Sequence, residues 1–124
     1  MNLLLDTRVA LWALSAPWEL SADLRKRIEH APRVCVSAAS AWELAVKVSL
    51  GRARVAPGFG EAVRAAGFEE LPVAFAHAEL AAALVARGED SFDRLLAAQA
   101  LAEGLTLVTA DVGMRAYGVP LVVV

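Results

Sequence analysis

The chain has 124 residues, of which 58% are hydrophobic and 21% charged, and its formal net charge is −2. This composition excludes a disordered chain, and the length favours one domain over residues 1–124. The charge is unlike that of a basic nucleic-acid coat protein. No apolar run approaches the length of a membrane span, and the N-terminus lacks the features of a signal peptide. Cys35, the single cysteine, is expected to be a buried small hydrophobe in a protein of the reducing cytoplasm.

Short apolar runs alternate with longer helical segments in the first half of the chain. Asp6 or Thr7 can cap the first helix, Ser21 can cap the second, and Gly51 follows the third as a C-terminal residue. Pro17 interrupts the chain after the first helix. In chain order the predicted elements are strand Leu3–Asp6, helix Thr7–Leu14, helix Ser21–Ala31, strand Arg33–Ser37 and helix Ala38–Leu50.

The second half continues the same alternation. Glu69, Glu70 and Pro72 place the third strand near an edge of the sheet, and Gly88 and Gly104 close the helices that precede them. In chain order the predicted elements are helix Gly58–Ala66, strand Phe68–Val73, helix Phe75–Arg87, helix Ser91–Glu103, strand Leu105–Thr109, short helix Val112–Tyr117 and strand Val119–Val123.

This order of elements predicts an α/β fold. We expect a three-layer sandwich in which a mainly parallel five-stranded sheet has helices on both faces. The strands are apolar without alternation, as is typical of strands buried on both sides. Functional sites in such sheets lie at the carboxyl ends of the strands. Asp6 ends the first strand and Asp111 follows the fourth, so both are expected at that edge.

Carboxylates are the candidate functional groups, and each has an ordinary structural alternative. The aspartates can cap helices or interact with helix dipoles. Glu43 can form an i,i+4 pair with Lys47. However, helix 38–50 is apolar almost all round and is expected to be largely buried. An i,i+4 pair stabilises a protein too little to explain why a carboxylate is placed on a buried helix. The four candidates are Asp6, Glu43, Asp93 and Asp111.

Convergent carboxylates would favour a hard cation. Bare carboxylates in one place repel each other, whereas Mg²⁺ binds oxygen ligands and keeps several waters. The lack of a Cys/His cluster argues against zinc. His30 and His77 are isolated and are expected on the surface or on a helix face. Trp12, Trp18 and Trp42 offer interface area, but core packing is the expected role for most of them.

Four stretches of the chain resemble the PIN-domain family, and within it the VapC-type toxins of bacterial type II toxin–antitoxin pairs. The resemblance covers nearly the whole chain, and the third stretch is distinctive. The stretches are residues 3–7 (LLLDT), 36–51 (VSAASAWELAVKVSLG), 90–100 (DSFDRLLAAQA) and 103–111 (EGLTLVTAD).

The resemblance implies a metal-dependent ribonuclease. By position, the acids implied to bind Mg²⁺ or Mn²⁺ are Asp6, Glu43, Asp93 and Asp111. Asp90 matches an acidic position that accompanies them, and Thr7 and Thr109 match small polar positions beside the metal. The resemblance also implies a homodimer and an antitoxin partner whose peptide blocks the acidic groove.

The predicted reaction is hydrolysis of an RNA phosphodiester by in-line attack of water, with one or two metal ions activating the water and neutralising charge. Glu43 would bind a metal or position the water. The candidates for phosphate contacts are Arg8, Lys47 and Arg94, and each has an alternative role as an ion-pair partner.

Two other functions remain as alternatives. One is a PIN-like binding module without activity, although the complete set of four acids argues against it. The other is a phosphoacceptor receiver domain. That domain needs an acidic pair after the first strand and an aspartate ending the central strand. Here Asp6 is followed by Thr7, and the third strand ends Leu71-Pro72-Val73.

Overall fold

The computed structural model describes residues 1–84 and 91–124. Within them the strands form one sheet of five parallel strands. The strands are β1 (Leu3–Leu5), β2 (Val34–Ser37), β3 (Glu69–Leu71), β4 (Thr106–Thr109) and β5 (Leu121–Val123). The α-helices are α1 (Thr7–Ser15), α2 (Ala22–His30), α3 (Ala38–Ser49), α4 (Phe59–Ala65), α5 (Phe75–Ala83) and α6 (Ser91–Glu103), and the 3-10 helices are η1 (Pro17–Glu19) and η2 (Val112–Tyr117).

The strand order is β3-β2-β1-β4-β5, which places β1 at the centre and β3 at an edge, as predicted for β3. Leu5 pairs with Val36 on one side and with Val108 on the other. The backbone amide of Asp6 continues this ladder and donates to the Val108 carbonyl at 2.9 Å. A receiver domain has β1 between β2 and β3 instead, so the sheet order does not support that alternative.

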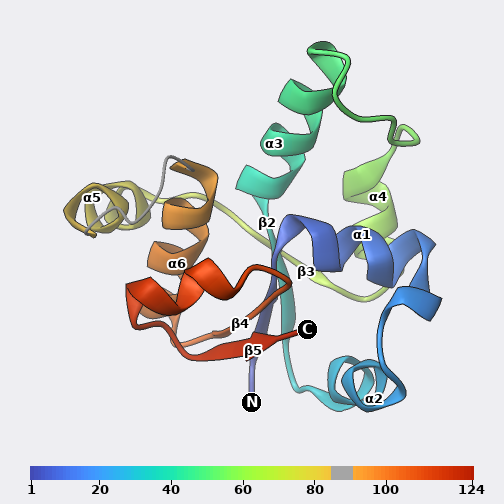
Figure 1. Cartoon of the computed structure of the whole chain (residues 1–124), viewed down its shortest axis with the longest axis horizontal. Coiled ribbons are helices and arrows are strands. Elements are labelled where there is room, and N and C mark those ends of the chain that lie inside the picture. The colour runs from blue at the N-terminus through green and yellow to red at the C-terminus, as the bar shows by residue number, and fades with distance from the viewer. Residues whose placement is uncertain (85–90) are drawn as a thin grey trace.

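Helices cover both faces of the sheet, which confirms the predicted α/β sandwich. Figure 1 shows α1, α2 and α4 on one side of the strands and α5, α6 and η2 on the other. Leu3 and Leu5 pack in the core beneath α1, α2 and α4, whereas Leu4 packs with α6 and η2. Successive residues of β1 therefore serve opposite cores, which explains its uninterrupted apolar sequence. Cys35 lies fully buried in the second core, as expected.

Most helix ends follow the predicted capping residues. The Ser21 hydroxyl accepts from the Leu24 amide at 3.1 Å at the start of α2, and α6 has the predicted bounds. The helix predicted over Phe75–Arg87 ends at Ala83 instead, because Leu84 has extended backbone angles (φ −70°, ψ 136°). Its predicted end at Arg87 and Gly88 lies outside the described residues. The predicted short helix over 112–117 has 3-10 geometry.

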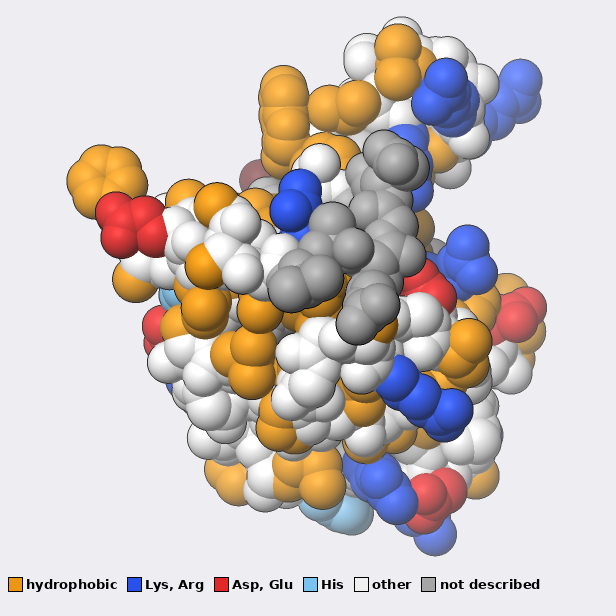
Figure 2. Space-filling view, turned by 60° about the vertical axis from the view of Figure 1, so that its left-hand side comes forward, with side chains coloured by type: hydrophobic (Ala, Val, Ile, Leu, Met, Phe, Trp, Pro, Cys, Tyr) orange, Lys and Arg blue, Asp and Glu red, His pale blue; other side chains and the backbone are white. Residues whose placement is uncertain are grey.

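The prediction that α3 is largely buried was wrong. Only the face bearing Glu43 and its neighbours contacts the body of the molecule, while Trp42 is 64% exposed. Figures 1 and 2 show the end of α3 and the following loop standing out from the rest of the molecule. Trp18 is also exposed, at 73%, so core packing is wrong for both tryptophans, whereas Trp12 packs against the core. Among the described helices, none is both long and apolar enough to span a membrane.

Candidate active site

Asp6 ends β1 and begins α1. Its backbone is extended (φ −70°, ψ 172°), and its Oδ1 accepts a hydrogen bond from the Val9 amide at 2.8 Å. Its Oδ2 accepts a hydrogen bond from the Thr109 hydroxyl. Asp6 therefore caps α1, as considered above, but the cap uses only Oδ1. The second oxygen, Oδ2, faces the end of β4, where Thr109 lies.

The environment of Asp6 disfavours its negative charge. Burial raises the pKa of Asp6 above its ordinary value of 3.8, and hydrogen bonds from Thr109 and Val9 offset part of this rise. A positive charge close to the carboxylate would lower the pKa again. Asp6 is thus a half-buried acid that a bound cation would stabilise in its ionised form.

Thr109 connects the ends of β1 and β4. Its side chain is buried, and its hydroxyl donates to Asp6 while accepting from the Asp111 backbone amide at 3.0 Å. The Asp111 Oδ1 in turn accepts from the Gly113 amide at 2.8 Å and caps η2. The chain beyond β4 is therefore bent so that Asp111 lies near the end of β1.

Glu43 is 7% exposed, although the helix that carries it protrudes. Its Oε2 lies 3.4 Å from Lys47 Nζ, and half of the Lys47 side chain is exposed. The predicted i,i+4 pair is therefore present. An i,i+4 pair normally lies on an exposed helix face, whereas this carboxylate lies on the face of α3 that turns toward α1 and α6.

Thr7 helps to orient that helix. Its buried hydroxyl donates to Ser40 Oγ at 2.9 Å, which joins the first turn of α1 to the first turn of α3. The interaction places Thr7 at the cavity that the acids line. Ser40 was not singled out in the sequence, because a serine in an alanine-rich helix gives no local signal of such a partner.

Of the remaining predicted acids, the structure places Asp93, on α6. Asp93 lies in its first turn and is half-buried. Asp90 lies outside the described residues. The first turn of α6 is a favourable position for a carboxylate because of the helix dipole.

A single open cavity of about 550 Å³ brings these groups together. We call it the acidic cavity. It lies at the carboxyl ends of β1 and β4, between α1, α3 and α6, where the α/β fold was expected to place a site. Among the described residues, the charged ones that line it are Asp6, Glu43, Asp93, Asp111, Arg8, Lys47, Arg52 and Arg54.

The basic residues of the cavity differ from those predicted. Arg8 and Lys47 line it, but Arg94 does not. Arg52 and Arg54 were missed. They follow Gly51 in a loop without a regular period, and only their proximity to the helix bearing Glu43 hinted at a shared site.

The donor set fits a hydrated divalent cation. Within residues 1–84 and 91–124, no group of three or more Asp, Glu, His or Cys side chains is arranged to hold a metal by itself. Mg²⁺, however, usually binds through one or two carboxylates and keeps water ligands. An open cavity lined by carboxylate oxygens, with a half-buried Asp6, has the chemistry for such an ion.

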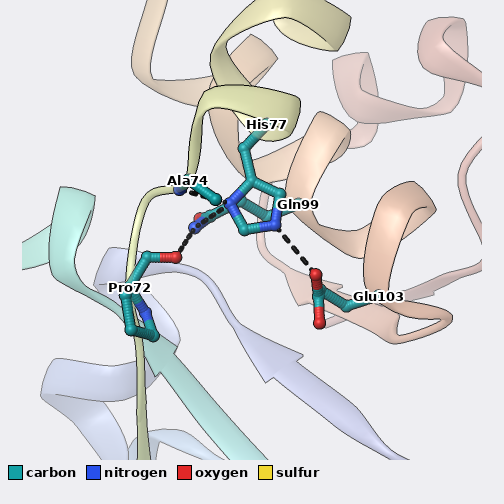
Figure 3. Close-up of polar contacts among 5 residues, drawn as sticks. All are labelled: Pro72, Ala74, His77, Gln99 and Glu103. Carbon is teal, nitrogen blue, oxygen red and sulfur yellow. Dashed lines mark hydrogen bonds and ion pairs between the residues drawn. The ribbon is translucent and has the colours of Figure 1, made fainter.

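His30 is exposed and His77 lies on a helix face, as expected, but His77 is not isolated. His77 is 3% exposed and belongs to a polar network between α5 and α6 (Figure 3). Its Nδ1 accepts from the Ala74 amide at 2.9 Å, so Nε2 carries the proton and donates to Glu103 at 3.0 Å. Gln99 Nε2 lies 3.4 Å from His77 Nδ1 and donates to the Pro72 carbonyl at 3.2 Å. The network fastens α5 to α6 and lies outside the acidic cavity.

Solved structures with the same fold come from several organisms. The DNA-bound VapBC structure from Salmonella typhimurium matches with a TM-score of 0.70 at 18% identity, covering 98% of this chain and 97% of that one. VapBC2 from Rickettsia felis, bound to a promoter DNA fragment, matches with a TM-score of 0.68 at 16% identity and 98% coverage of both chains. At these identities the likeness establishes the fold.

Sequence comparison gives the family. Ribonuclease VapC22 of Mycobacterium tuberculosis is 34% identical over 130 aligned positions, which cover 96% of this chain and 94% of that protein. The PIN domain family model matches residues 3–120. The chain therefore belongs to the PIN-domain family.

Proposed function

We propose that this protein is a Mg²⁺- or Mn²⁺-dependent endoribonuclease and the toxin of a toxin–antitoxin pair. The observation that carries the proposal is the convergence of Asp6, Glu43, Asp93 and Asp111 on one cavity at the carboxyl edge of the sheet. The name of the ribonuclease that is 34% identical to it supports RNA as the substrate.

The residues of the cavity divide the chemistry between them. Asp6, Asp93 and Asp111 would hold the metal, with Thr109 and the helix cap fixing the orientation of Asp6. A bound divalent ion would lower the pKa of a water and neutralise charge on the phosphate. Glu43 would orient the attacking water or bind a second ion. In the reaction, water forms a bond to phosphorus while the bond to the leaving sugar oxygen breaks.

A matched pair of variants tests this assignment. Asp6→Asn removes the charge but keeps a good helix cap, so the fold should persist. Cleavage of single-stranded RNA should fall by more than about a hundredfold, since residues that only orient metal ligands already contribute about 10- to 100-fold. Asp23→Asn changes an exposed acid of α2 that pairs with Arg27, and it should cleave like wild type. EDTA should abolish cleavage by the wild-type protein. If it does, and Asp6→Asn still cleaves RNA at the wild-type rate, the assignment of Asp6 as a metal ligand is overturned.

The inactive PIN-like binding module makes the opposite prediction. Calorimetric titration with Mn²⁺ should show binding to the wild-type protein and weaker binding to Asp6→Asn. A wild-type protein that neither binds Mn²⁺ nor cleaves RNA would favour the binding module. The receiver alternative is set aside, because the chain belongs to the PIN-domain family.

The partners in the proposal follow from the similar structures. The two described above are VapBC structures, and a toxin–antitoxin complex from Klebsiella pneumoniae has the same fold at 18% identity with a TM-score of 0.65. These structures support an antitoxin partner. The homodimer and the cytoplasmic location are proposed on the family resemblance alone. Co-expression with the protein encoded directly upstream should give a complex, and that complex should not cleave RNA.

A further inference from the structure

The basic residues of the acidic cavity are not equivalent. Lys47 Nζ lies 3.4 Å from Glu43, so its charge is largely engaged within the protein. The Arg8 guanidinium lies 6.0 Å from the centre of the Trp12 ring. Arg52 and Arg54 line the same cavity and form no ion pair within the described parts of the chain. Among the described cations that line the cavity, they are the two with neither an ion pair nor a ring contact.

The end of α3 determines where these arginines lie. Gly51 has a φ of +69°, and its amide donates to the Val48 carbonyl at 3.0 Å. The Arg52 amide donates to the Lys47 carbonyl at 2.9 Å. This pair of hydrogen bonds is the Schellman motif, in which a left-handed residue reverses the chain at the helix end. The backbone of Arg52 is thereby fixed against the last turn of α3.

The loop beyond this turn alternates exposed and half-buried residues. Arg52 and Arg54 are exposed, while Ala53 and Val55 are half-buried. All of them line the acidic cavity. The small apolar residues thus hold the loop against the protein, and the guanidinium groups are left at the cavity and in solvent.

We propose that Arg52 and Arg54 bind the phosphates of the RNA strand that flank the phosphate being cleaved. This inference rests on the proposed ribonuclease function. The four carboxylates of the cavity repel those phosphates of an RNA strand that lie away from a bound metal, so the flanking phosphates are best held by cations beside them. Arginine suits this role because its planar fork donates two parallel hydrogen bonds to a phosphate. The loop is therefore a positioning element for the substrate, separate from the metal ligands.

Steady-state kinetics of Arg52→Gln/Arg54→Gln tests the inference. If the arginines bind flanking phosphates equally in the ground state and the transition state, KM should rise while kcat stays near wild type. Each phosphate contact to a single strand contributes a log–log salt slope of about 0.7. Between about 50 and 200 mM salt, the KM of wild type should therefore rise about sevenfold more than that of the double variant.

Two controls separate this role from a general effect of charge. Arg25→Gln/Lys26→Gln removes the same charge from exposed positions of α2 that do not line the cavity, and it should keep the wild-type KM and salt slope. Arg52→Lys/Arg54→Lys keeps the charge but loses the planar guanidinium group. It should have the salt slope of wild type and a KM between those of wild type and Arg52→Gln/Arg54→Gln. Circular dichroism should show that Arg52→Gln/Arg54→Gln is folded, and titration with Mn²⁺ should show that its metal affinity is not weaker than that of wild type.

The outcomes distinguish this inference from the function on which it rests. If wild type cleaves RNA and the double variant keeps its KM and salt slope, the inference alone is overturned. A fall in kcat with an unchanged KM also overturns it, because the arginines would then act in the transition state or on the fold. If wild type cleaves no RNA with either metal, the proposed function fails and the inference fails with it.

Discussion

Thr109 donates a hydrogen bond to Asp6 across the ends of β4 and β1, although the two residues are 103 positions apart in the sequence. The same hydroxyl accepts from the amide of Asp111. One side chain therefore sets the orientation of a carboxylate on the central strand and the path of the chain toward a second carboxylate. This arrangement makes Thr109 a sensitive position even though it contributes no carboxylate of its own.

Thr109→Val keeps the shape of the side chain and removes its hydroxyl. We expect metal-dependent RNA cleavage to fall by about 10- to 100-fold, as for other residues that orient metal ligands, with a stability loss of about 1 kcal/mol. Thr106→Val makes the same change at the other end of β4 and should retain activity. Thr109→Ser should recover most of the loss. Equal activities for the two valine variants in a cleavage assay would contradict this role.

His77→Ala should destabilise the protein. The change removes the acceptor of the Ala74 amide, leaves Gln99 Nε2 with the Pro72 carbonyl alone, and opens space between α5 and α6. We expect a loss of about 2–3 kcal/mol in the free energy of unfolding, measured with urea. His30→Ala, at an exposed position at the end of α2, should change it by less than about 0.5 kcal/mol. Similar midpoints for both variants would show that the network adds little stability.

Cys35 should be an unreactive thiol in the folded protein. Burial raises the pKa of Cys35 to about 11, so only about 0.1% of it is thiolate at pH 8. Iodoacetamide should therefore modify the native protein very slowly and the urea-unfolded protein quickly, as measured by mass spectrometry. Rapid modification under native conditions would mean that β2 opens readily to solvent.

Glu69→Gln should lower stability in a pH-dependent way. The hydrogen bond from Arg33 lowers the pKa of Glu69 below its ordinary value of 4.5. A carboxylate with a lowered pKa stabilises the fold above the unfolded-state pKa, and this contribution is lost as the pH falls through the folded-state pKa. The difference between wild type and variant should thus be present at pH 7 and disappear in acid well below pH 4.5.

Glu70→Gln on the same strand provides the comparison. Glu70 interacts with Arg64 at 3.5 Å on the exposed surface, and such pairs contribute little. The unfolding curves of Glu70→Gln should therefore match those of wild type both at pH 7 and in acid. A pH-independent loss in Glu69→Gln would instead point to packing of the Glu69 side chain.

The order and type of the elements could be predicted from the sequence because local signals agreed with the fold. Ser21 caps α2, and α6 runs from Ser91 to Glu103 before Gly104, which has a φ of +67°. The exposure of α3 could not be predicted in the same way. An alanine-rich helix with Trp42 on its outer face has the composition of a buried helix, and only the tertiary arrangement leaves that face open.

The candidate site was predictable where residues follow strand ends. Asp6 and Asp111 lie at the edge to which a parallel sheet brings them, whatever the details of packing. Arg52 and Arg54 were not predictable, because their place depends on the chain reversal at Gly51 and on the space between α3 and the strand ends. The partners of His77 were not predicted, because Gln99 and Glu103 come from a different helix.

The long separation between Asp6 and Thr109 has a consequence for synthesis on the ribosome. Asp6 is synthesised 103 residues before the threonine that orients its carboxylate. Until β4 inserts beside β1, the nascent chain has no complete cavity. If the protein is the ribonuclease proposed above, its active site can therefore form only after β4 has been synthesised.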